Sequence, residues 1–233
     1  TNGGELRTSG ASTLDGVTLD ANLRIFSGHT VESANGLTLA NGAVISVEQG
    51  GGSAILEFSG TQTLGGTGEV VLNGSAGTSN FVRSELAGQT LTIGENVTIR
   101  TGLRGGTVGL ATGSLVNQGT ISAETASQTL TVTGTNWSNE GLLRATAGTL
   151  RLDGSIAVGG LGAFEANGGV VRLDGTLNNA GHTLLLDGST ARLTLGSGSA
   201  IVGGVVTGTN GGELRTGGAP TLDGVTLDAN LRI

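Results

Sequence analysis

The chain returns to its own beginning near its end. Residues 1–25 and residues 209–233 carry almost the same sequence, and the second copy begins 208 residues after the first. The two copies differ at two places: Ser9/Gly217 and Ser12/Pro220. Repetition at a fixed offset is the sequence signature of a tandem array. We therefore expect residues 1–208 to be one repeat unit and residues 209–233 to begin the next, within a single continuous fold that is a window on a longer array.

A shorter period lies inside the long repeat. Between positions 110 and 200, segments rich in Val, Leu and Ile recur at a regular spacing, which is close to the periods of solenoid repeats. Their apolar residues form three ladders: Val116, Trp137, Val158 and Leu177; Ile121, Leu143, Phe164 and Leu184; Leu130, Leu150, Val171 and Ala191. A companion ladder follows the third at a distance of two residues: Val132, Leu152, Leu173 and Leu193. Two residues is the spacing of side chains on one face of a strand, so each period predicts three short strands.

The composition indicates how these strands are joined. Gly makes up 46 of the 233 residues, nearly three times its ordinary share, and Pro occurs once. Four Phe, one Trp and no Tyr or Met leave few large side chains for a wide core. Leucine-rich repeats have a similar period, but their leucine frame and helical return are absent. We therefore predict an all-β fold, a parallel β-solenoid of three strands and about 21 residues per coil, with about ten coils in one repeat unit.

Charge and residue usage exclude several classes of function. The net charge is −7, from eighteen carboxylates and eleven arginines, which argues against binding to nucleic acid or to an anionic membrane surface. The absence of Cys excludes disulfides and thiolate metal sites. No apolar run reaches the roughly 18 to 20 residues of a membrane span. We expect no cofactor, no metal and no membrane insertion of this segment.

The carboxylates are the first candidates for chemistry, because pectate-lyase-like β-helices place Asp clusters and a basic residue on one strand face. The candidates lie in Leu-Asp-Gly segments: Asp15, Asp153, Asp174 and Asp187. An Asp before Gly is typical of a tight turn. The period places Asp153 and Asp174 one rung apart, beside an arginine row: Arg151, Arg172 and Arg192. We interpret this cluster as acids that offset repulsion between arginines, with sugar or cation binding as the alternative.

The remaining candidates are few. His29 and His182 share no metal-ligand spacing, so a zinc site is not expected. Trp137 is expected in the core, with stacking on a sugar as the alternative. Thr131 and Thr133 form one isolated Thr-x-Thr pair, whereas an ice-binding solenoid would need a continuous ladder. No catalytic, cofactor-binding or metal-binding residue is therefore predicted.

Three segments resemble the repeats of known surface proteins. They are TLDGVTLDANL at 13–23, NGLTLANG at 35–42 and GTLRLDG at 148–154. In this style of repeat the chain is similar to the passenger regions of filamentous-haemagglutinin-like and autotransporter β-helix adhesins of bacteria. The resemblance implies a right-handed β-helix, export to the cell surface, and a role in adhesion, matrix or filament building.

These observations lead to one functional expectation and two alternatives. We expect a non-enzymatic structural or adhesive segment of a long extracellular bacterial fibre or surface protein, which acts as a rigid rod. Its expected partners are identical neighbouring repeats, end to end, with lateral contacts to other rods or to surface glycans. The first alternative is a polysaccharide-binding or polysaccharide-degrading β-helix, and the second is an ice-binding solenoid.

Overall fold

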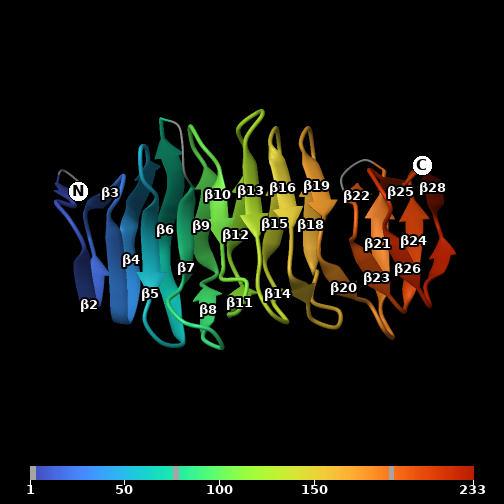
Figure 1. Cartoon of the computed structure of the whole chain (residues 1–233), viewed down its shortest axis with the longest axis horizontal. Helices are drawn as coiled ribbons and strands as arrows, with labels where there is room; N and C mark the ends of the chain where they lie inside the picture. Colours follow the sequence, from blue (N-terminus) through green and yellow to red (C-terminus); the bar gives the residue numbers. More distant parts are fainter. Residues whose placement is uncertain (1–3, 76–78, 189–191) are drawn as a thin grey trace.

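The computed structural model describes residues 4–75, 79–188 and 192–233. The described residues form β-strands and turns without a helix, and the strands pair in parallel. The fold is a parallel β-solenoid of about ten turns with about 22 residues per coil. Figure 1 shows the strands stacked in one row, with the two termini at opposite ends. The all-β solenoid predicted from the sequence is confirmed.

Each coil contributes one strand segment to each of three faces, and the long strands β2, β4 and β6 turn corners between faces. The first face contains β1 (Glu5–Arg7), β3 (Asn22–Phe26), the ends of β4 (Thr30–Gln49) and β6 (Gln62–Gly74), β9 (Asn96–Thr101), β12 (Thr120–Ala123), β15 (Leu142–Ala145) and β18 (Ala163–Ala166). The second face contains the starts of β2 (Ser12–Leu19) and β4, then β5 (Ala54–Phe58), β7 (Asn80–Ser84), β10 (Gly106–Val108), β13 (Thr129–Val132), β16 (Thr149–Leu152), β19 (Val170–Leu173), β22 (Leu193–Leu195), β25 (Glu213–Thr216) and β28 (Asn230–Arg232).

The third face contains the end of β2, the middle of β4 and the start of β6, then β8 (Thr90–Ile93), β11 (Ser114–Asn117), β14 (Ser138–Asn139), β17 (Ser155–Ile156), β20 (Thr176–Asn178), β23 (Ala200–Val202) and β26 (Thr221–Asp223). Three further strands pair with one another: β21 (Thr183–Asp187), β24 (Val205–Thr209) and β27 (Thr226–Asp228). Along the chain, strands of the first, second and third faces follow one another in that order. Because β21 lies between β20 on the third face and β22 on the second, it belongs to the first face.

The core is a set of apolar ladders between these faces. Side chains alternate along each strand, so every second residue points inward and lies over a similar residue of the next coil. Three predicted series are in register as expected: Ile121, Leu143 and Phe164; Leu130, Leu150 and Val171; Val132, Leu152 and Leu173. Apart from Phe164, which is slightly accessible, these side chains are fully buried.

Other rungs of the predicted ladders are wrong. Leu115, not Val116, is the buried apolar residue on β11, because Val116 pairs with Ser138 and points outward. Ile156 replaces Val158: it bridges to Trp137 and pairs with Leu177, whereas Val158 is 51% exposed.

The end of the third ladder also differs. Val171 pairs with Leu193, and Leu173 pairs with Leu195, so the prediction that Leu193 follows Leu173 is wrong by two residues. Ala191 lies outside the described residues. The predicted step from Phe164 to Leu184 joins two strands, β18 and β21, that do not pair. A fixed period misplaces these rungs because the strand ladder sets the register, whereas each corner holds a different number of residues.

Coil length varies widely along the chain. The coil that separates the register partners Val70 and Ile99 is more than half as long again as the coil that separates Leu6 and Leu23. The strands remain in register because the extra residues are accommodated at corners, where they form no ladder. The predicted period near 21 therefore describes the second half of the solenoid better than the first.

The two copies of the repeated sequence occupy different faces. β1 pairs with β3 on the first face, whereas its copy β25 pairs with β22 on the second. Likewise, residues 12–15 of β2 belong to the second face, and their copy β26 belongs to the third. The 208-residue repeat therefore does not span a whole number of coils. Each segment of the second copy lies one face further around the solenoid than in the first copy, which is a rotation of about a third of a circle. The boundary between the two repeats falls inside β24, so the solenoid continues through it.

This rotation predicts a specific cross-link. The chain has no Cys, so we expect Thr194→Cys with Arg215→Cys to form a disulfide under mild oxidation. The two residues are register partners, and the spacing of about 4.8 Å between paired strands lies within the range that a disulfide spans. Leu185→Cys with Arg215→Cys is the control, because Leu185 lies on the face that β25 would occupy if the repeat held whole coils. Efficient cross-linking of the control pair, detected by mass spectrometry, would contradict the rotation.

Candidate functional site

The predicted Arg and Asp cluster exists on the outer surface of the second face. Arg151 pairs with Arg172 in the strand register, and Asp153 and Asp174 each follow two residues later. Arg151 forms ion pairs with Asp153 at 2.8 Å and with Asp174 at 2.7 Å, and Arg172 reaches Asp174 at 2.6 Å. Only 11% of the Asp174 side chain is exposed. The predicted stacking of the two acids is confirmed.

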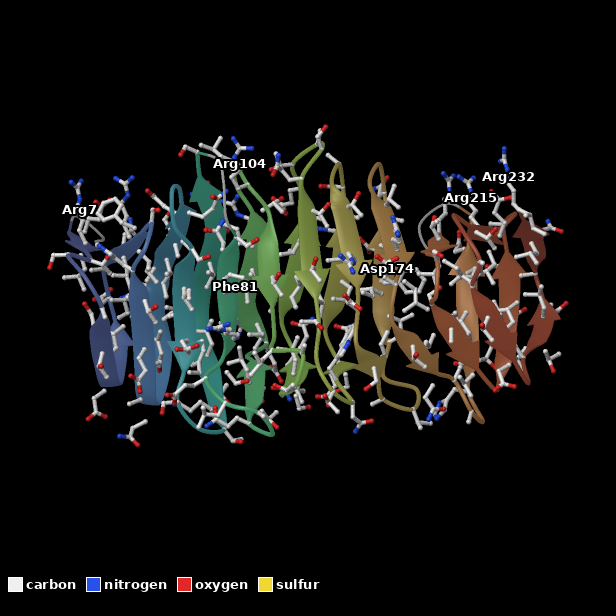
Figure 2. All side chains as sticks on the ribbon, in the orientation of Figure 1. Arg7, Phe81, Arg104, Asp174, Arg215 and Arg232 are labelled. Atoms are coloured by element: carbon white, nitrogen blue, oxygen red, sulfur yellow. The ribbon has the colours of Figure 1, made fainter. Side chains whose placement is uncertain are left out.

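The arginine row continues differently from the prediction. Arg172 pairs with Thr194, and Thr194 pairs with Arg215. Arg215 in turn pairs with Arg232, and both lie near the C-terminal end of the stack (Figure 2). Arg192 lies outside this row, where its Nε donates a hydrogen bond to the carbonyl oxygen of Gly188. The sequence misplaced Arg192 for the same reason that it misplaced the last rungs of the third ladder, since this coil is longer than the prediction assumed.

The candidate Leu-Asp-Gly carboxylates accept hydrogen bonds from their own surroundings. Asp153 accepts the Gly154 backbone N–H, and Gly154 has φ +72°, as a tight turn requires. A Cβ on Gly154 would lie 2.2 Å from the Gly134 carbonyl oxygen, so the coil below excludes any side chain. Asp15 and Asp187 accept hydrogen bonds from the amides of asparagines one coil further on. Hydrogen bonds to these carboxylates therefore stabilise corners and join adjacent coils.

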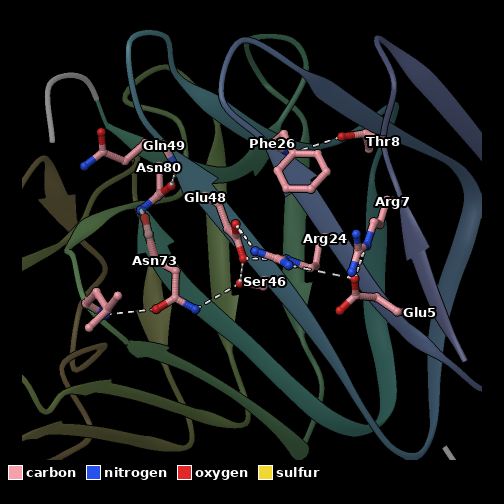
Figure 3. A network of polar contacts seen from close by, with 11 residues as sticks. Glu5, Arg7, Thr8, Arg24, Phe26, Ser46, Glu48, Gln49, Asn73 and Asn80 are labelled. Carbon is pink, nitrogen blue, oxygen red and sulfur yellow. Dashed lines mark hydrogen bonds and ion pairs between the residues drawn. The ribbon is translucent and has the colours of Figure 1, made fainter. Parts of the chain in front are cut away.

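A second polar network covers the beginning of the first face (Figure 3). Arg24 holds Glu48 through two parallel hydrogen bonds, Nε to Oε1 at 2.9 Å and Nη2 to Oε2 at 2.7 Å. Ser46 donates to Glu48 at 2.8 Å, and the Arg24 guanidinium lies 5.2 Å from the centre of the Phe26 ring. Glu5 lies between Arg7 and Arg24. This ladder of alternating charge joins three successive coils.

The network shifts the protonation of both central groups. Burial raises the pKa of Glu48, but hydrogen bonds from Arg24 and Ser46 and the nearby positive charge outweigh it, so the pKa is below its ordinary value. The hydrogen bond to Glu48 raises the pKa of the Arg24 guanidinium above its ordinary value. Both groups are therefore charged near neutral pH, and neither is suited to exchange protons there.

The histidines and the tryptophan have separate environments. His29 Nδ1 lies 2.8 Å from Thr8 Oγ1, and His182 lies on a different coil. Within the residues that the structure describes, no group of three or more His, Cys, Asp and Glu side chains could hold a metal ion. Trp137 is fully buried, and its Nε1 donates to the Asp153 carbonyl oxygen at 2.8 Å. The prediction of a core tryptophan is confirmed.

Buried carboxamides were missed by the sequence analysis. Asn117 donates to the Oδ1 of Asn139 at 2.6 Å, and Asn139 donates to the carbonyl oxygens of Leu161 and Ala163, both at 2.9 Å. Asn80 similarly accepts the backbone N–H of Gln49. Asn117 and Asn139 are register partners one coil apart, and the recurrence of Asn at the coil period is the signal that could have revealed this internal ladder.

Further observations concern the whole chain. Among the described residues, no helix has the length and apolar character needed to cross a membrane. No protein-family model matches the chain, and no curated protein or solved structure is significantly similar to it. The resemblance to haemagglutinin-like and autotransporter adhesins therefore stays a prediction from the repeat sequences.

The pKa shift of Glu48 predicts a pH-dependent loss of stability. Because the folded pKa is lowered, the carboxylate stabilises the fold above its unfolded pKa, and this contribution disappears as pH falls through the folded value. We expect Glu48→Gln to cost about 1 kcal/mol at pH 7 and progressively less as the pH falls through the folded pKa of Glu48. Urea unfolding at several pH values measures this difference.

The matched control is Glu32→Gln, which removes a carboxylate outside the described ion pairs. Its effect should be small at every pH. A loss of stability for Glu48→Gln that does not shrink as the pH falls from 7 would show that the missing charge is not the cause.

Proposed function

We propose that the chain is a non-catalytic, rigid segment of a long extracellular bacterial fibre or surface protein, with a structural or adhesive role. The observation that carries this proposal is the difference in solvent exposure between equivalent leucines of the two repeat copies. Leu6 is 49% exposed at one end, whereas its copy Leu214 is fully buried; Leu23 is 4% exposed, whereas its copy Leu231 is 41% exposed at the other end. The same residue is covered wherever a neighbouring coil lies beside it.

These exposed leucines support end-to-end stacking of repeats. A terminal coil leaves both a row of backbone hydrogen-bonding groups and its inward side chains without a neighbour. The end of β4 pairs with β3 and covers it, and β28 has the same sequence as the matching part of β3. A following repeat would therefore cover β28 with the register that is already present between β3 and β4.

The outer surface also supports a scaffold more than an enzyme. Most of its arginines form ion pairs with carboxylates, several of them between adjacent coils, as in Arg24 with Glu48 and Arg151 with Asp174. Such pairs join neighbouring coils along the axis. Because each repeat turns the sequence by one face, an array would present any lateral feature of the repeat in three directions in succession, which suits contacts on all sides of a rod.

This function predicts how length depends on repeat number. Adding a further copy of residues 26–208 after residue 233 completes a second repeat unit, and each complete unit should lengthen the particle by about 45 Å. Negative-stain images and small-angle scattering measure the length. Compact particles of constant length would contradict the rod.

The control is Leu231→Asp in the extended chain. This residue is exposed at the end of the present chain but would be buried at the junction, so the carboxylate should interrupt stacking only in the extended protein. We expect little change in the thermal stability of the 233-residue chain and a loss of cooperative unfolding across the junction in the extended one.

Polysaccharide binding is the second candidate, and one groove favours it. A groove of about 450 Å³ on the second face is lined by Gln49, Arg104, Gln128, Thr131 and Arg151. Gln49 Oε1 and Arg104 Nε are buried without a hydrogen-bond partner. A hydroxyl group of an acidic sugar would donate a hydrogen bond to Gln49 Oε1, and its carboxylate would accept one from Arg104 Nε.

This candidate predicts binding without cleavage. An oligouronate should bind by calorimetry, and Arg104→Gln should weaken the binding at least about fivefold by removing one charged contact. Release of reducing ends would instead favour the degrading enzyme, and equal binding by the variant would exclude this groove.

A further inference from the structure

The sheet on the first face is interrupted between β18 and β21. β18 pairs with β15 on one side and β21 pairs with β24 on the other, but the two do not pair with each other. The same two coils remain joined on the second face, by β19 and β22, and on the third face, by β20 and β23. Two strand edges therefore face each other across a break in an otherwise continuous stack (Figure 1).

A cleft of about 490 Å³ occupies this break. It is lined by both strand edges, including Ala163, Phe164 and Glu165 of β18 and Thr183, Leu184 and Leu185 of β21. His182 and Asn179 close the end where the third face begins.

The cleft reaches the hydrophobic core. Phe164 is 7% exposed and Leu184 is 6% exposed, whereas Leu143 and Val206, their counterparts on the paired strands outside the break, are fully buried. An aliphatic side chain placed between Phe164 and Leu184 would complete the interrupted ladder. Burial of such a side chain would favour binding, because it removes apolar surface from water.

The surroundings of the cleft are apolar and acidic. Val158, Val170 and Leu185, on the two coils that border it, are between 44% and 52% exposed. Glu165 is part-buried and belongs to none of the described ion pairs, although it is in register with Arg144. A cation opposite Glu165 would be favoured.

We propose that this cleft binds an extended peptide strand of a partner protein, which inserts between β18 and β21. Only an extended backbone offers N–H and C=O groups to both edges at once. The chemistry of the cleft selects an aliphatic residue, to lie between Phe164 and Leu184, followed directly by Arg, to lie beside Glu165. Paired strands of the first face already carry this pattern, as in Ile99-Arg100 of β9 and Leu143-Arg144 of β15.

The test uses the intact 233-residue chain and a fluorescein-labelled peptide of sequence NVTIRT, which copies β9. We expect a saturable rise in fluorescence anisotropy. The control peptide replaces Ile with Pro, which removes both a backbone donor and the inward side chain, and it should bind at least about tenfold more weakly. Glu165→Gln in the chain should weaken binding of the Arg peptide about threefold and leave a peptide with Gln in place of Arg unaffected.

Amide hydrogen exchange locates the binding. In the free chain, the amides of β18 and β21 that face the cleft should exchange faster than those of β15 and β24, and the peptide should slow them. Self-association of the chain that the peptide reverses would identify a second copy as the strand donor and would support strand insertion. Slow exchange at both edges in the free chain, no binding up to millimolar peptide, or protection confined to other faces would each overturn the proposal. None of these results depends on whether the chain forms rods.

Discussion

Parallel stacking of backbone on backbone is the constraint on which the structure depends. Most strands are too short to be stable alone, and their N–H and C=O groups are satisfied only by the coils before and after them. Close stacking restricts the choice of residue most at corners, where the backbones of successive coils approach each other closely. A Cβ on Gly66 would lie 1.9 Å from the Leu39 carbonyl oxygen. The high Gly content therefore follows from the stacking itself, and the few large side chains follow from the narrow space between the three faces.

The sequence predicts this fold well and its register less well. The period shows that like residues stack, which is why Ile121, Leu143 and Phe164 were placed correctly. It does not show how many residues each corner holds, and the step from Trp137 to Ile156 is shorter than the step from Val171 to Leu193. Corner length is set by local turn geometry, which leaves a weaker trace in the sequence than the apolar ladder does.

The same limit explains the polar residues. Asp153 and Asp174 were predicted to stack because they follow a well-placed strand, and the coil between them has the predicted length. Arg24 is in register with Ser46, and its partner Glu48 lies two residues further along the same strand, so a ladder of equivalent positions does not reveal their bidentate pair. The break between β18 and β21 could not be seen either, because a ladder written from sequence assumes that every coil pairs with the next.

The rotation between repeats and the interruption of the first face together make the surface of the solenoid differ from one side to another. The second face runs without a break from β2 to β28, and the third face continues from β14 to β17 through the bridge between Trp137 and Ile156, whereas the first face is open between β18 and β21. Because the copied segments move by one face between repeats, the equivalent opening in a following repeat would lie on the second face and then on the third. A partner strand bound at such openings would decorate an array helically, and an uninterrupted pair of faces would still connect each coil to the next.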